Sequence, residues 1–387
     1  MTEIICTGLD GKNPLHVLAA LGLLQLGSSM GQEVTLHWRL DQSWHPVVNV
    51  REQTSTTAPM DATSIAQALR ALARVGERDQ SQERLARDLG TSRKQLIERS
   101  KKERSAAKEA AKSLASDERR QSLLEFELRL DRELSEIDRA ITAAQDIVND
   151  ALGAGVAHLG DIIGVAPSIF RRKAGQACSA WLGKEEIGQG VSAALITDAM
   201  SSQACDAIVD GKGVVQNTPL SFSNGAGGQC LLKAFRTLAS NVTPEQVTGT
   251  LTGSAVRYLS GATPLNWDPA DQRDYALTWA SPEDKQINPK QTDVAANTLA
   301  LLGLSLLTAC PRGDRLEPLG WKQRGPEQGF TWPLWTSPLS ISVVRSLMAS
   351  VPSKSIERQA MGIRTVLTAA RINPTGKRNF FAPARPT

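Results

Sequence analysis

Residues that build metal centres and catalytic nucleophiles are scarce in this sequence. The 387 residues include only four histidines and five cysteines, and no two cysteines have CxxC spacing. No His-x-x-x-His pair, P-loop or GxGxxG pattern occurs. A zinc ribbon and a dinucleotide or Walker-type phosphate site are therefore not indicated. We expect no nucleophile elbow, no catalytic residues, no metal and no cofactor.

Long apolar runs are also lacking. No window approaches the roughly 18 uninterrupted apolar residues of a membrane-spanning helix, and the chain opens on Met-Thr-Glu, unlike a signal peptide. The scattered cysteines are typical of small core residues rather than of a disulfide framework. We expect a cytoplasmic protein with no membrane partner.

Acidic residues are nearly absent from the C-terminal end. Residues 343–387 hold eight Lys or Arg and a single acid, Glu357. Such a basic block favours binding of an anion, nucleic acid above all, because clustered cations displace its condensed counterions. The alternative is a solvated terminal helix followed by a loose tail. Two helices are predicted in this region, at 341–350 and 356–370.

The patterning predicts an α+β fold in four parts. These are an N-terminal α/β unit at 1–58, a charged helical domain at 59–150, a mixed α/β part with a Gly-rich loop at 151–260, and a Trp-rich α/β region with a basic C-terminal tail at 261–387. The last part combines short strands with terminal helices, one of them expected at 292–307. It contains five of the eight tryptophans.

The first part is expected to run strand, helix, strand, strand. A short strand is predicted at 4–7, a helix at 15–26 with Pro14 as its first residue, and a hairpin of strands at 34–40 and 47–50. The helix is so apolar that it must be covered on all sides. We expect the sheet to continue in a later segment of the chain.

Residues 61–149 favour helices, since proline is absent between Pro59 and Pro167. Residues 84–112 hold ten bases and four acids, whereas 113–150 hold five bases and ten acids. This asymmetry predicts an antiparallel pair of helices with complementary charge. Residues 85–98 also have the pattern of a helix-turn-helix with Gly90 at the turn, so a stand-alone DNA-binding regulator is an alternative.

Three further segments are candidates for contact with nucleic acid: residues 101–104, residues 171–173 and a glycine-rich stretch with the helix predicted after it. A glycine-rich stretch, TPLSFSNGAGGQ at 218–229, precedes a predicted helix at 230–238, and exposed N–H groups at such a helix start bind phosphate. The alternatives are a plain turn capped by Asn224 and the anion site of an enzyme acting on phosphorylated small molecules. The candidate contacts are Lys101, Lys102, Arg104, Arg171, Arg172, Lys173, Asn224, Gly225, Gly227, Gly228, Gln229, Lys233, Lys377 and Arg378.

Four segments in this order resemble the large-subunit-like proteins of type I-G (formerly I-U) CRISPR Cascade effector complexes. The first, GLDGKNPLHVLAALGLL at 8–24, is similar to the N-terminal signature of that family. The others are WDPADQR at 267–273, ANTLALLGL at 296–304 and FTWPLW at 330–335. Large subunits of the family are often longer than this chain.

The resemblance implies a role in crRNA-guided surveillance. In that family the large subunit recognises the protospacer-adjacent motif, helps to open the target duplex and recruits a separate helicase-nuclease. The implied partners are crRNA, target DNA, the backbone and guide-end Cascade subunits and the helicase-nuclease. The charged helices would then resemble the bundle that contacts the displaced or target strand.

Overall fold

The computed structural model combines helices with antiparallel sheets, which confirms the predicted α+β class. The chain divides into two compact units, one of residues 1–74 and 154–387 and one of residues 75–153. The structure describes residues 2–51, 59–73, 77–110, 116–151, 206–209, 212–215, 218–222, 237–254, 258–259, 265–270, 291–313, 315–324, 327–351, 354–373 and 379–387.

The N-terminal sheet of the larger unit is built from both ends of the chain. The predicted hairpin is confirmed, and the first strand lies two residues earlier than expected. The fourth strand comes from the C-terminal region, which confirms that the sheet continues in a later segment. In order across the sheet, all antiparallel, the strands are β1 (Thr2–Ile5), β3 (Trp44–Arg51), β2 (Glu33–Leu40) and β12 (Leu339–Ser340).

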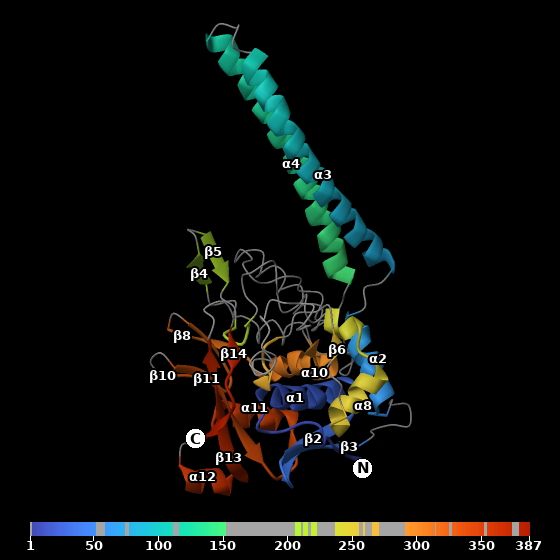
Figure 1. Cartoon of the computed structure of the whole chain (residues 1–387), viewed down its shortest axis with the longest axis vertical. Coiled ribbons are helices and arrows are strands. Elements are labelled where there is room, and N and C mark those ends of the chain that lie inside the picture. Colours follow the sequence, from blue (N-terminus) through green and yellow to red (C-terminus); the bar gives the residue numbers. More distant parts are fainter. Residues whose placement is uncertain are drawn as a thin grey trace, which may run out of the picture. The chain divides into compact units, whose positions relative to one another are not determined.

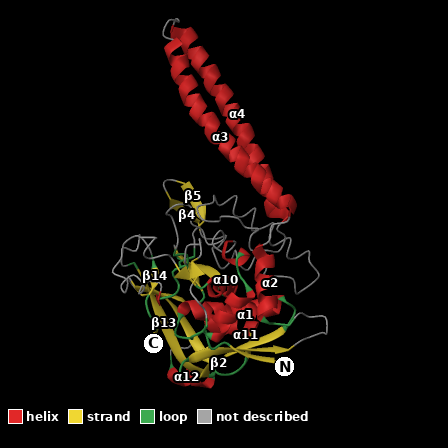
Figure 2. Cartoon of the chain, turned by 45° about the vertical axis from the view of Figure 1, so that its right-hand side comes forward, coloured by secondary structure: helices red, strands yellow, loops and turns green. Residues whose placement is uncertain are grey.

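Helix α1 (Pro14–Ser29) is covered on all sides, as its composition predicts. It packs against β2 and β3 on one side and against α10 (Val294–Gly303) on another, so that α1 lies between the sheet and α10 (Figures 1 and 2). A short 3-10 helix, η3 (Leu304–Leu306), continues α10. Each leucine buried here contributes about 1.5–3 kcal/mol, so this layer is a large share of the core.

Two glycines set the distance between α1 and α10. A Cβ atom on Gly22 would lie 1.8 Å from the carbonyl oxygen of Leu299, and one on Gly303 would lie 2.1 Å from that of Leu18. These separations are far below van der Waals contact. The two backbones therefore touch directly, and no larger residue fits at either position.

The second sheet includes three strands from the basic C-terminal region. The expected helix at 356–370 is wrong beyond Ala360. Gly362 has a φ of +73°, which ends α12, and residues 363–372 pair with β11 on one side and with β14 and β15 on the other. The elements are β10 (Trp321–Arg324), β11 (Glu327–Trp335), α11 (Ile341–Ala349), α12 (Ser355–Ala360), β13 (Ile363–Ile372), β14 (Phe380–Phe381) and β15 (Arg385–Pro386).

Smaller elements complete the larger unit. Helix α2 (Ala62–Ala73) packs against α8 (Pro244–Thr252), which begins with a capping box between Thr243 and Gln246. Three two-stranded ribbons are also present. They are β4 (Asp206–Val209) with β5 (Lys212–Val215), β6 (Tyr258–Leu259) with β7 (Gln291–Thr292), and β8 (Ala309–Arg312) with β9 (Arg315–Pro318).

The smaller unit is a long helical hairpin of α3 (Glu77–Ala110) and α4 (Ser116–Ala151) (Figure 1). The predicted antiparallel, charge-complementary pair is confirmed, since Arg93 pairs with Asp138 and Arg104, further along α3, pairs with the earlier Glu127. The apolar residues of α4 recur every three or four positions and are half-buried: Leu123, Phe126, Leu130, Leu134, Ile137 and Ile141.

The helix-turn-helix expected at 85–98 is wrong. Residues 77–110 form one uninterrupted helix, and Gly90 lies inside it. The hydroxyls of Thr91 and Ser92 donate to the carbonyls of Arg87 and Asp88 one turn earlier instead of capping a new helix. The pairing with α4 along its length stabilises α3 as a straight helix, which leaves no second helix free to enter a groove of DNA.

Among the helices that the structure describes, none combines the length and the apolar character needed to cross a membrane.

Candidate nucleic-acid interface

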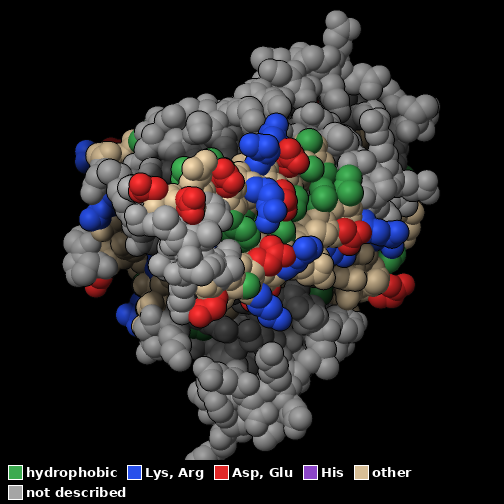
Figure 3. All heavy atoms as spheres, turned by 90° about the horizontal axis from the view of Figure 1, so that it is seen from above, with side chains coloured by type: hydrophobic (Ala, Val, Ile, Leu, Met, Phe, Trp, Pro, Cys, Tyr) green, Lys and Arg blue, Asp and Glu red, His purple; other side chains and the backbone are tan. Residues whose placement is uncertain are grey.

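The candidate bases on the helical hairpin are exposed and mostly engaged in ion pairs. Arg104 pairs with Glu127 of α4, and the ammonium of Lys101 lies 2.6 Å from the Glu98 carboxylate on its own helix. Lys102 is exposed, and no ion pair is recorded for it within the described part of the chain. On the face shown in Figure 3, described Lys and Arg side chains likewise lie among Asp and Glu side chains. Exposed pairs contribute only about 0–1 kcal/mol, so a phosphate can displace the carboxylate at little cost.

The other candidate contacts lie outside the described residues. They are Arg171, Arg172, Lys173, Asn224, Gly225, Gly227, Gly228, Gln229, Lys233, Lys377 and Arg378. For two of these segments the described residues on either side are informative, because they show where each segment leaves the folded core.

Phe222, which precedes residues 223–236, lies next to Phe381, which follows residues 374–378. The ring of Phe222 packs edge-on against that of Phe381 with 4.7 Å between ring centroids. Phe381 belongs to β14, and the pairing of Ile372 with Phe380 closes the β13–β14 hairpin around residues 373–379. Segments that are about 150 residues apart in sequence therefore start from adjacent points at one end of the second sheet.

Both segments are basic and free of acids. Residues 223–236 and 374–378 contain no Asp or Glu, and together they contribute four cations: Lys233, Arg236, Lys377 and Arg378. Clustered cations without acids are typical of segments that bind a polyanion.

A row of buried aromatic rings fixes the base of this candidate site. Phe381 also lies against Phe330, at 6.3 Å between ring centroids, and Phe330 stacks on Trp332 at 5.2 Å. The indole N–H of Trp332 donates to the carbonyl of Gly11 over 2.8 Å. The row therefore ties the origin of both basic segments to the N-terminal loop at 8–13.

The four segments that carry the family resemblance meet in one core. The Asn13 side chain caps α1 by accepting from the N–H of Leu15, and it donates to the Asp268 carboxylate over 3.0 Å. The third segment is α10, which touches α1 through Gly22 and Gly303. The fourth is β11, where Trp332 reaches Gly11 and the Trp335 indole donates to the carbonyl of Leu36. Packing requirements explain these residues without any reaction.

The acidic segment at 267–273 shows no metal geometry where it is described. Asp268 is buried, and its Oδ1 accepts from the Asn13 side chain and from the N–H of Ala270. No group of three His, Cys, Asp or Glu side chains suited to a metal ion occurs among the residues that the structure describes. These two hydrogen bonds show that Asp268 stabilises the turn at 268–270 and joins it to Asn13.

Residues 27–31 match the Gly-x-Ser-x-Gly spacing of a nucleophile elbow, contrary to the sequence-based expectation. Their structure is not an elbow, because an elbow joins a strand to a following helix and these residues end α1 before β2. The Ser29 hydroxyl donates to the carbonyl of Leu26 over 2.7 Å.

Burial raises the pKa of the Cys6 thiol to about 12, so this cysteine stays protonated at neutral pH.

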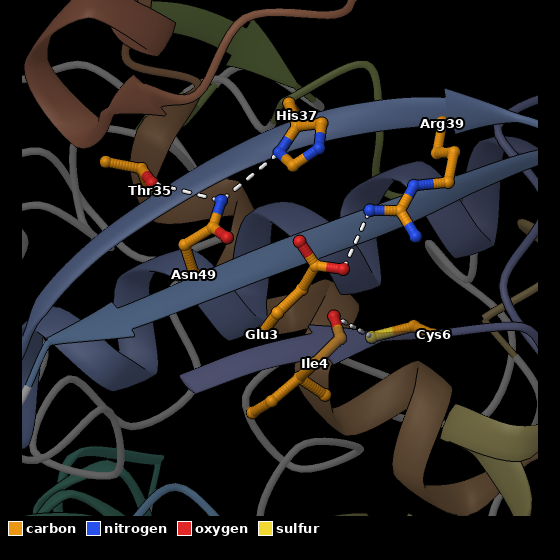
Figure 4. A network of polar contacts seen from close by, with 7 residues as sticks. All are labelled: Glu3, Ile4, Cys6, Thr35, His37, Arg39 and Asn49. Atoms are coloured by element: carbon orange, nitrogen blue, oxygen red, sulfur yellow. Dashed lines mark hydrogen bonds and ion pairs between the residues drawn. The ribbon is translucent and has the colours of Figure 1, made fainter. Parts of the chain in front are cut away.

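A polar network occupies the face of the N-terminal sheet that points away from α1 (Figure 4). Arg39 of β2 reaches across β3 to Glu3 of β1, with 2.7 Å between guanidinium and carboxylate. Beside this pair, the Asn49 amide N–H lies 3.2 Å from Nδ1 of His37. Because the amide is the donor, Nδ1 is the acceptor and carries no proton. Sequence reasoning took these residues only as parts of a hairpin.

We expect His37 to make the stability of the larger unit depend on pH. Burial, followed by the nearby Arg39 charge, lowers the pKa of His37, so the unfolded chain takes up this proton at higher pH than the folded chain. Stability contributed by neutral His37 is present above about pH 6.5 and is lost as the pH falls through the lower folded pKa. Denaturant titrations between pH 7.5 and 5 should show a steeper decline for the wild type than for His37→Gln; parallel declines would contradict the assignment.

Comparison with known proteins adds no assignment. No family model matches the chain, and no curated protein is significantly similar to it in sequence.

Sequence reasoning did not place Arg371 or Gln328 in the site. Both lie in the second sheet, where Arg371 pairs with Phe381. Arg371 was counted only within the basic tail, one residue beyond the helix expected at 356–370. Residues 363–372 show no strict alternation of apolar and polar side chains, so no local pattern predicted the strand that carries Arg371.

Proposed function

We propose that this chain is a non-catalytic subunit of a crRNA-guided CRISPR surveillance complex. It binds target DNA, contributes to recognition of the protospacer-adjacent motif and to opening of the duplex, and recruits a separate helicase-nuclease. The protein acts in the cytoplasm with crRNA and the other Cascade subunits. Base pairing by the guide supplies sequence specificity, while the protein binds backbone and shape.

One observation carries the nucleic-acid part of this proposal: Phe222 and the β13–β14 hairpin, which adjoin two basic, acid-free segments in the sequence, lie side by side in the core. The assignment to a Cascade complex is supported by the resemblance of four segments, in order, to large-subunit-like proteins. Their meeting in one core is what a shared fold requires. The uninterrupted α3 counts against the alternative of a helix-turn-helix regulator.

Expression with the neighbouring genes, followed by affinity purification of this chain, tests the proposal. We expect a defined small RNA and repeated backbone subunits to co-purify. Recovery of the chain alone, without nucleic acid, would sink the proposal. Sequencing of the bound RNA distinguishes a guide with constant repeat-derived ends from a random cellular fragment.

Charge removal tests the contribution of Lys377 and Arg378. We expect Lys377→Gln with Arg378→Gln to weaken binding of all oligonucleotides alike and to reduce the slope of log affinity against log salt by about 1.4 for single strands. The matched control, Lys354→Gln with Arg358→Gln, removes the same charge from α12. An unchanged slope in the first variant would exclude these two residues from the site.

A further inference from the structure

Arg371 is an arginine without an acidic partner among the residues that the structure describes. It lies near the end of β13, paired with Phe381 on one side, and it is half-buried. Its guanidinium carbon is 5.6 Å from the centroid of the Phe222 ring, and one of its N–H groups lies 3.5 Å from the Gln328 amide oxygen. No ion pair joins it to an Asp or Glu of the described residues.

Arg371 is half-buried, with a neutral amide and an aromatic ring beside it. Partial removal of an ion from water costs free energy that a neutral amide only partly restores. The ring of Phe222 attracts the guanidinium through a cation–π contact but carries no net negative charge to neutralise it. Desolvation lowers the pKa of Arg371, yet arginine stays charged at every physiological pH. The guanidinium of Arg371 is thus a positioned cation, and only one of its N–H groups has a hydrogen-bond acceptor among the described residues.

The surrounding sequence adds cations and no acids. Arg371 touches Phe222, which directly precedes residues 223–236, and lies three positions before the start of the 374–378 segment that holds Lys377 and Arg378. The two flanking segments contain no Asp or Glu to neutralise it. The local positive charge therefore favours binding of an external anion.

We propose that Arg371, held by Phe222 and Gln328, is a binding site for a backbone phosphate of a nucleic-acid strand. The inference rests on the proposed function and adds to it a specific anchor. The planar guanidinium donates two parallel hydrogen bonds to a phosphate, which suits arginine better than lysine. Phe222 fixes the plane of the fork, so little side-chain entropy is lost on binding.

Binding of labelled single-stranded DNA and RNA to the full-length protein tests the inference. For Arg371→Gln we expect affinity to fall about tenfold and the salt slope to fall by about 0.7. Arg371→Lys keeps the charge, so it should retain the salt slope while losing part of the affinity. This second variant also serves if Arg371→Gln does not fold, which tryptophan fluorescence reports.

The control variant is Arg364→Gln. Arg364 is an exposed arginine on the same strand, seven residues away, or about 23 Å along an extended chain. That is more than two Debye lengths at physiological salt, so its loss should leave affinity unchanged.

The outcomes separate the two proposals. If the wild type binds and Arg371→Gln binds as well as Arg364→Gln, the phosphate site at Arg371 is overturned and the proposed function stands. If the wild type binds neither strand and no RNA co-purifies with its partners, both fall. A loss that is equal for DNA and RNA supports recognition of the phosphate rather than of the sugar.

Discussion

Replacing Gly22 with alanine is expected to destabilise the larger unit by about 3 kcal/mol. The added methyl would lie 1.8 Å from the carbonyl oxygen of Leu299, so α1 and α10 would have to separate along their whole contact. Alanine raises helix propensity by about 1 kcal/mol relative to glycine, and this gain offsets only part of the cost. Gly303→Ala meets the carbonyl of Leu18 at 2.1 Å, and we expect it to behave alike.

The measurement can be confined to the unit concerned. All eight tryptophans belong to the larger unit and none to residues 75–153, so urea denaturation followed by tryptophan fluorescence reports the larger unit alone. Gly90→Ala is the matched control, since a Cβ on Gly90 meets nothing within 4 Å. It should raise the thermal stability of the hairpin helices, measured by circular dichroism. A Gly22→Ala variant as stable as the wild type would refute the direct contact of the two helices.

Replacing Trp332 with alanine is expected to cost about 3–5 kcal/mol. The side chain is fully buried, stacks on Phe330 and donates to Gly11. Its removal leaves a large cavity in the middle of the aromatic row and orphans the Gly11 carbonyl. Because the row continues to Phe381 and Phe222, we also expect nucleic-acid affinity to decrease.

Trp332→Phe separates the two contributions to this loss. The phenyl ring retains most of the stacking but cannot donate, so the expected cost is about 1–3 kcal/mol for an unpaired buried carbonyl and a smaller cavity. Urea titrations of both variants measure the difference. Equal stabilities for Trp332→Phe and the wild type would show that the hydrogen bond to Gly11 contributes nothing.

The family resemblance and the candidate site draw on different residues. Asn13, Gly22, Asp268 and Trp332 lie in or beside the core and hold the fold together. The charged segments proposed to bind nucleic acid are not among these residues. The binding experiments must therefore be directed at Arg371, Lys377 and Arg378.

Local signals were sufficient where an element forms from its own neighbours. Pro14 and the Asn13 cap determine the start of α1, and its uniform apolar character determines that it is covered. The charge asymmetry of residues 84–150 likewise determines an antiparallel hairpin, because complementary charges on adjacent helices attract at every turn. The turn expected at Gly90 was not found, since one glycine costs about 1 kcal/mol and pairing with α4 outweighs it.

Tertiary contacts decided the rest. Residues 363–372 contain helix-forming alanine and leucine, but they form a strand because β11 and β15 offer backbone partners and Gly362 ends the helix before them. The apposition of Phe222 with Phe381 joins residues 159 positions apart. The sequence by itself determined that the chain has a basic C-terminal end. Only the folded topology places Arg371 beside Phe222 and Gln328, because contacts between distant segments follow from strand pairing and leave no periodic trace in either segment.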